Sequence, residues 1–145
     1  MNCIKEAESK LRMYNARKHA LKSLSEQIAN LEAQMTCVRS AAADGTAVHG
    51  GGSGRENALL DNIAEREELK KALDATKKWV NAVSGALDAL TSEERRILEL
   101  FYIEKQKGCV ERLSEEMHMS TASVYRRRDD ALRNFTHCYY GVLET

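Results

Sequence analysis

The segment "RLSEEMHMSTASVYRRRDDAL", residues 112–132, decides how the C-terminal third of the chain folds. Leu113 and Met117 are four residues apart, which is typical of apolar residues on one face of a helix. Ser120 follows them, and its hydroxyl oxygen suits the N-cap of a second helix that carries Val124. The segment therefore predicts two short helices joined by a turn of three or four residues.

The spacing of the residues expected inside is that of a helix-turn-helix. In a twenty-residue frame that begins at Val110, each inner position holds an apolar or a small residue. These inner positions are Leu113, Ser114, Met117, Met119 and Val124. His118 stands in the turn where glycine is common, and histidine tolerates the left-handed conformation better than most residues do. We therefore expect a helix-turn-helix here.

The residues predicted to bind DNA lie at the start of the second helix of this pair. They are Ser120, Thr121, Ala122, Ser123, Tyr125, Arg126, Arg127 and Arg128. The first turn of a helix has free backbone N–H groups, which suit a phosphate. Tyr125 and Arg126 lie roughly opposite Val124, where a helix in the major groove meets base edges. Arg127 and Arg128 are expected to flank the groove and meet phosphates.

A solvated helix face with internal ion pairs is the other interpretation of the three arginines. Asp130 follows Arg126 by four residues, and Asp129 precedes Arg133 by four, so both pairs could form on one helix at ~0.2–0.5 kcal/mol each. The whole chain has 22 Lys and Arg against 22 Asp and Glu. Charge alone therefore does not favour DNA, and the prediction depends on the helix-turn-helix spacing.

The N-terminal part predicts two long helices. Apolar residues follow a heptad pattern, first as Leu21, Leu24, Ile28, Leu31, Met35 and Val38, and later as Leu69, Leu73, Thr76, Val80, Val83, Leu87 and Leu90. A glycine-rich stretch at about 42–54 separates them, and Ser53 with Glu56 is expected to cap the second helix. We expect a coiled-coil-like helical hairpin over residues 1–89, whose two arms pack on each other or against a second chain, and a homo-oligomer formed through these helices.

A second break is predicted after Leu90. Thr91 and Glu94 have the spacing of a capping box, so a new helix should begin at Thr91 and run to about Gln106 before Gly108. The expected fold class is all-α, with a DNA-binding domain over residues 90–145 after the hairpin.

Several classes of protein are not supported by the sequence. No carboxylate pair, phosphate loop or Ser/His/Asp order points to an enzyme, and "GGGSG" lacks the lysine of a phosphate loop. The four cysteines form no metal-binding spacing and are expected to be buried or half-buried thiols, so neither metal nor cofactor is predicted. No apolar run reaches the ~18 residues of a membrane span, and a cytoplasmic protein is expected.

The segment that begins "LTSEERRILELFYIEKQ" and ends at Phe135, about 46 residues, resembles region four of bacterial sigma factors. The residues that fit its pattern are Leu90, Thr91, Glu94, Arg95, Ile97, Leu98, Leu100, Tyr102, Ser120, Val124, Arg127, Ala131 and Leu132. We expect no promoter-melting region before this segment, and the resemblance implies that Arg127 can brace the fold instead of meeting a phosphate. With the N-terminal helices included, the layout resembles phage and prophage transcription regulators of the RinA/ArpU kind.

This resemblance implies a sequence-specific DNA-binding regulator in a bacterial host cell. Its expected partners are double-stranded DNA and bacterial RNA polymerase, and its implied role is to activate phage or prophage late genes near a promoter. A phage small terminase subunit is the alternative, because it also joins a helix-turn-helix to helical oligomerisation elements but marks DNA for packaging.

Overall fold

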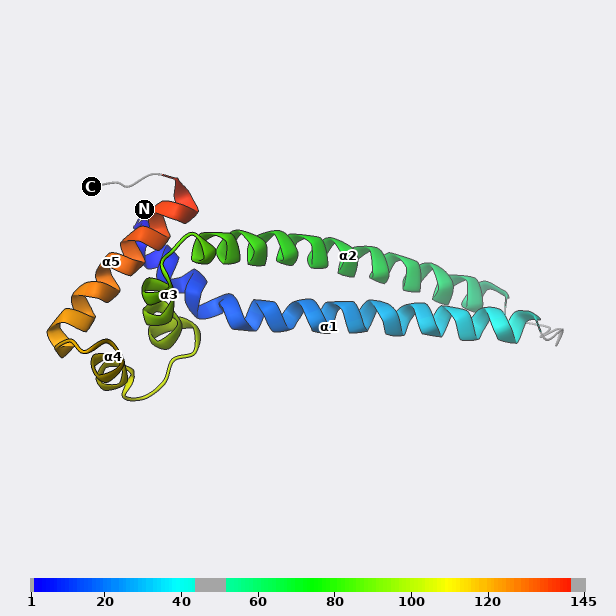
Figure 1. Ribbon diagram of the computed structural model, residues 1–145. Coiled ribbons are helices and arrows are strands. Elements are labelled where there is room, and N and C mark those ends of the chain that lie inside the picture. The colour runs from blue at the N-terminus through cyan, green and yellow to red at the C-terminus, as the bar shows by residue number, and fades with distance from the viewer. Residues whose placement is uncertain (1, 44–51, 142–145) are drawn as a thin grey trace. The chain divides into compact units, whose positions relative to one another are not determined.

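A computed structural model describes the backbone of residues 2–43 and 52–141, and within these ranges every regular element is a helix (Figure 1). The elements are α1 (Cys3–Ala43), α2 (Gly52–Asp88), α3 (Ser92–Leu98), the π-helix η1 (Glu99–Ile103), α4 (Cys109–Met117) and α5 (Thr121–Tyr140). The expected all-α class is confirmed for this part of the chain.

The long helices extend further than expected towards the glycine-rich stretch. α1 continues to Ala43 and α2 begins at Gly52, so Ser53 lies inside α2 instead of capping it from outside. Adding a residue to an existing helix is much easier than nucleating a new one, so a strong helix can propagate into poor helix formers. The remainder of the expected loop, residues 44–51, lies outside the described residues.

The chain forms two compact units. The first, here the terminal unit, comprises Met1–Lys18 and Lys78–Thr145, and the second, the middle unit, comprises His19–Lys77. The terminal unit thus takes residues from both sides of the boundary that we expected between residues 89 and 90.

The core of the terminal unit combines the ends of α1 and α2 with the shorter helices. Its most deeply buried large side chains are Leu11, Val83, Leu87, Ile97, Leu98, Leu100, Leu113, Val124 and Phe135. Polar contacts add to this packing, because Tyr102 Oη donates to Glu8 at 3.2 Å and Asn15 Nδ2 donates to the carbonyl of Ile103 at 3.3 Å. The beginning of α1 is therefore part of the scaffold that carries α3, η1 and α5.

The predicted break between α2 and α3 is confirmed, and so is its cap. Thr91 accepts a hydrogen bond from the amide of Glu94, and the Glu94 carboxylate accepts from the amide of Thr91 in return. A π-helix follows α3, whereas the sequence predicted one helix to about Gln106. Gly108 then adopts a left-handed conformation, with φ at 73°, and directs the chain into α4.

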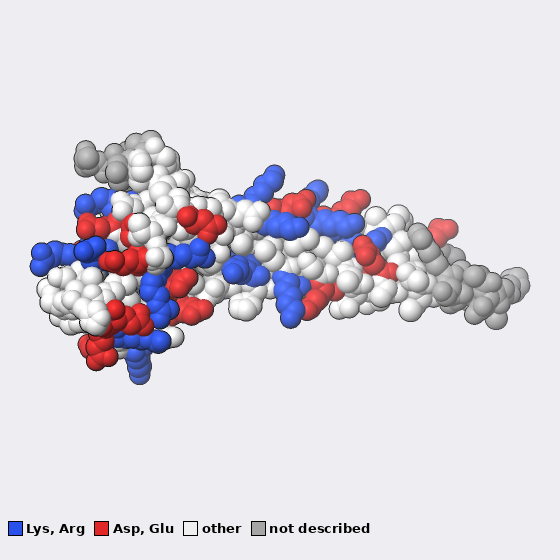
Figure 2. Space-filling model, in the orientation of Figure 1, with Lys and Arg blue, Asp and Glu red and all other residues white. Residues whose placement is uncertain are grey.

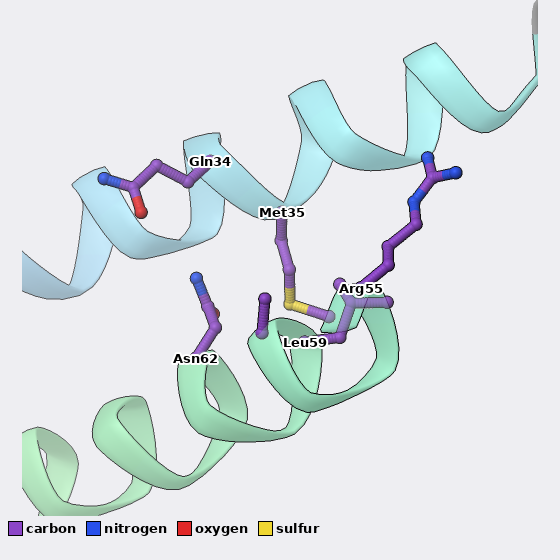
Figure 3. Close-up of a pocket in the computed structure, with 6 residues that line it drawn as sticks. Gln34, Met35, Arg55, Leu59 and Asn62 are labelled. Atoms are coloured by element: carbon purple, nitrogen blue, oxygen red, sulfur yellow. The ribbon is translucent and has the colours of Figure 1, made fainter. Parts of the chain in front are cut away.

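In the middle unit, α1 and α2 meet through one polar cluster. Asn62 Nδ2 donates to the carbonyl of Leu31 at 3.1 Å, and Arg66 lies 4.0 Å from the Glu32 carboxylate. Figure 3 shows Asn62 turned towards α1 beside Met35. The Asn62 Oδ1 and Arg66 Nε atoms are buried without a hydrogen-bond partner among the described residues. On α2 these polar groups therefore lie before the predicted apolar stripe, which begins at Leu69.

Candidate nucleic-acid interface

The turn between α4 and α5 consists of residues 118–120. His118 has φ at 52° and ψ at 47°, so the expected left-handed histidine is confirmed. The half-buried Ser114 holds this turn, because its hydroxyl donates to the carbonyl of Met119 at 2.5 Å while its own carbonyl accepts from the Met119 amide at 3.2 Å. The small residue at position 114 thus fixes the angle at which α5 leaves α4.

The inner faces of α4 and α5 share one apolar cluster with α3 and η1. Its fully buried members are Ile97, Leu100, Leu113 and Val124, and Met117 and Met119 are packed against it. These include four of the five inner positions that the sequence predicted for the helix pair. Apolar packing therefore places α5 rigidly against the rest of the terminal unit.

The first turn of α5 keeps part of its hydrogen-bonding capacity free. Ser120 caps the helix by accepting from the amide of Ser123 at 3.2 Å, as the sequence predicted. The first amides of a helix have no partner within the helix. Three amides were expected to meet a phosphate, and the cap uses that of Ser123. The amides of the exposed residues Thr121 and Ala122 remain available.

The three consecutive arginines have three different environments. Arg127 donates to the carboxylate of Glu93 at 3.2 Å and so connects α5 to α3. Arg128 donates to Asp129 at 2.8 Å, and only 28% of its side chain is exposed. Arg126 is exposed and makes no hydrogen bond or ion pair with any described residue.

The two aspartates that follow do not form the ion pairs that the helical spacing suggested. Asp129 pairs with its neighbour Arg128 instead of Arg133, and Asp130 lies 3.9 Å from Arg133 instead of pairing with Arg126. Each carboxylate has an arginine that is nearer in the sequence than the one four residues away. Arg128 is adjacent to Asp129, and Arg133 is three residues from Asp130. The ion pair suggested for Arg126 is therefore absent among the described residues, and this arginine is exposed on the face of α5 that points away from the core.

Two of the acidic residues before α5, Glu99 and Glu116, are engaged with arginines outside α5. The Glu116 carboxylate accepts from Arg96 and from Arg112, each at 3.2 Å, and these contacts lower the pKa of Glu116, with Arg96 the larger cause. On the face drawn in Figure 2, Lys and Arg side chains are interleaved with Asp and Glu side chains. The chain as a whole has zero net charge, yet Arg126 on α5 has no partner among the described residues.

One residue next to the predicted site was not identified from the sequence as part of it. Phe101 in η1 lies against Tyr125, with ring centroids 6.1 Å apart, and the guanidinium of Arg128 lies over both rings. In the sequence, Phe101 falls within the helix expected from Thr91 to about Gln106. No local signal could have joined it to α5, because 24 residues separate it from Tyr125.

The described residues show no arrangement suited to a metal ion, since no three His, Cys, Asp or Glu side chains gather at one place among them. Cys3 and Cys109 are half-buried as expected, but Cys37 and Cys138 are exposed because they lie on outward faces of α1 and α5. Among the helices described, none is long and apolar enough to cross a membrane.

Comparisons with protein-family models, with curated protein sequences and with solved structures found no match to this chain.

Proposed function

We propose that this chain is a sequence-specific DNA-binding transcription regulator. The proposed interface is a helix-turn-helix formed by α4, residues 118–120 and α5, with α5 as the recognition helix in the major groove. Supporting observations are the apolar cluster that seats α5, the turn held by Ser114, and the left-handed His118.

The observation that carries this proposal is the free guanidinium of Arg126. Arg126 lies on the face of α5 that points away from the buried Val124, one turn after the available amides of Thr121 and Ala122. Its neighbours Arg127 and Arg128 are both paired. An unpaired arginine beside a helix N-terminus combines a group that reads guanine with a group that binds phosphate.

The wider role follows from the resemblance to sigma region four. On this proposal α1 and α2 form the helical hairpin that joins copies of the chain, and the C-terminal helices act near a promoter with host RNA polymerase. The regulated genes would be phage or prophage late genes. The polar cluster around Asn62 supports a specified helix pairing, because buried polar groups in helical interfaces select one register over others.

Selection from a random duplex library tests the proposal. The full chain should enrich one sequence family, and Arg126→Ala should lose ~1–3 kcal/mol of discrimination between that site and a scrambled duplex. Arg133→Ala is the matched control, since Arg133 is also exposed on α5 but lies 3.9 Å from Asp130. Equal losses on both duplexes for Arg126→Ala would contradict base recognition by this residue.

The packaging alternative makes a different prediction about assembly. A small terminase subunit would form a closed ring of many copies, whereas an activator of this kind would footprint beside a promoter as a small oligomer. Native mass spectrometry of the full chain separates the two. If the chain forms such a ring, a terminase subunit becomes the better proposal for its function. The proposed DNA interface would stay the same.

A further inference from the structure

Arg128 lies between two aromatic rings. Its guanidinium carbon is 5.2 Å from the ring centroid of Tyr125 and 5.3 Å from that of Phe101, which are distances of cation–π contacts. The two rings meet edge to face at 63°. Asp129 accepts two hydrogen bonds from the same guanidinium, at 2.8 and 3.1 Å. We call Phe101, Tyr125 and Arg128 the aromatic clamp.

These contacts leave Arg128 poorly suited to a phosphate. Its positive charge is already compensated by Asp129, and much of the planar group is in contact with the rings. Reaching out to DNA would break the ion pair and both ring contacts together. The contacts therefore favour a role for Arg128 inside the protein.

The same contacts fix Tyr125. Tyr125 is 45% exposed. One side of its ring lies against Phe101 and Arg128, and the rest is open to solvent. Its hydroxyl makes no hydrogen bond with any described residue. A ring that is held in place loses little conformational entropy when it binds, so it offers a ready-made apolar contact.

We infer that Arg128 is a positioning residue and that the Tyr125 ring contacts the C5 methyl group of a thymine. This inference rests on the proposed function. The thymine methyl is the apolar group that base pairs expose in the major groove, and the other features there are hydrogen-bond donors and acceptors. Tyr125 adjoins Arg126, so the thymine belongs within a base pair or two of the base that Arg126 reads.

Replacing single thymines by deoxyuridine tests this contact, because the exchange removes only the methyl group. Wild-type chain should bind the selected duplex about fourfold more weakly when one particular thymine is replaced, as expected for one buried methyl group. Tyr125→Ala should bind both duplexes equally. Tyr125→Phe keeps the ring and should keep the fourfold difference, so it controls for the hydroxyl and for loss of folding.

Arg128→Lys tests the positioning role. Lysine keeps the charge but has no planar group to lie between two rings. We expect Arg128→Lys to lose most of the discrimination against deoxyuridine while the slope of log affinity against log salt stays unchanged. Arg133→Lys, on the exposed face of the same helix, should change neither quantity. Combining Arg128→Lys with Tyr125→Ala should weaken binding no further than Tyr125→Ala alone.

Three results would overturn the inference or its foundation, and they are distinguishable. Wild-type affinity for Arg128→Lys, with a salt slope lowered by about one phosphate's worth in Arg128→Ala, would make Arg128 a phosphate contact. A selected site at which no thymine is sensitive to deoxyuridine would refute the Tyr125 contact while leaving the proposed function standing. Failure to select any sequence would refute the proposed function itself, and this inference with it.

Discussion

The carboxylate of Glu93 at the start of α3 lies 3.2 Å from the guanidinium of Arg127 in the middle of α5, across 34 residues of sequence. Two turns further along α5, Asn134 donates to the Glu94 carboxylate at 2.7 Å. These two contacts connect α3 to α5 along one edge of the terminal unit. Arg127 is thus tied to the scaffold, whereas Arg126 beside it is not.

Removing the Arg127 contact should affect stability more than recognition. Both partners are about half exposed, at 58% and 43% of their side chains, so the pair is worth at most about 1 kcal/mol. We expect Arg127→Ala to lower the free energy of unfolding by up to that amount in urea denaturation, and to leave the selected DNA sequence unchanged. A double-mutant cycle with Glu93→Gln isolates the coupling. A changed sequence preference would show that Arg127 reads bases.

The capping box of α3 should make the terminal unit sensitive to acid. Partial burial alone would raise the pKa of Glu94, but hydrogen bonds from Asn134 and Thr91 hold that pKa below its usual value. A lowered pKa in the folded state gives stability that is present above the unfolded value, 4.5, and is lost as the pH falls through the folded value. Urea denaturation below pH 4.5 should therefore show a weaker pH dependence for Glu94→Gln than for the wild type.

Thr91→Ala tests the other half of the capping box. Loss of an N-cap hydroxyl costs about 1 kcal/mol, and we expect that loss in the free energy of unfolding at pH 7. Ser92→Ala is the matched control, because Ser92 is an exposed neighbour whose hydroxyl makes no hydrogen bond within the described part of the chain. Equal effects of the two variants would argue against the cap.

Tyr102 should make the fold sensitive to alkali. Burial, and next the nearby Glu8 carboxylate, raise the pKa of Tyr102 to about 12. A raised pKa in the folded state gives stability that is complete below the unfolded value of 10.0 and is lost as the pH rises through 12. Tyr102→Phe should reduce the loss of stability between pH 10 and 12, measured by thermal unfolding. Tyr125→Phe is the control, since Tyr125 is exposed.

His118→Gly should stabilise the turn. A left-handed conformation costs a residue with a Cβ atom roughly 1–2 kcal/mol, and glycine avoids this while losing more chain entropy on folding. We expect a net gain of up to about 1 kcal/mol in the free energy of unfolding, with DNA preference unchanged. His118→Ala provides the comparison, and greater stability of the alanine variant than of the glycine variant would contradict the backbone argument.

The polar cluster in the middle unit should contribute specificity at the expense of stability. Asn62 Oδ1 and Arg66 Nε are buried without partners among the described residues, and replacing such groups by apolar ones is often neutral or stabilising. Asn62→Leu with Arg66→Leu should keep or raise the unfolding midpoint, and should broaden the range of oligomers seen by sedimentation. A large fall in the midpoint would show that the cluster stabilises this helix pair.

The sequence by itself determined the helices and the turns between the short ones. The capping box at Thr91 and Glu94, the cap at Ser120 and the inner residues of α4 and α5 could all be predicted. Each depends on groups a few residues apart on one chain, where the backbone geometry of a helix dictates which atoms meet. The left-handed His118 could be predicted for the same reason.

Only the tertiary structure decided which partner each charged or aromatic side chain has. Tyr102 meets Glu8 across 94 residues, which makes the start of α1 part of the terminal unit, and Arg127 meets Glu93 across 34. Phe101 approaches Tyr125 and Arg128 because packing of η1 against α5 brings them together. Spacing along one helix suggested a partner for Arg126, but competition among carboxylates and guanidinium groups in space assigned those partners elsewhere. Contacts between helices depend on where whole helices pack, which no local pattern contains, whereas Asp129 and Asp130 are paired with arginines of their own helix.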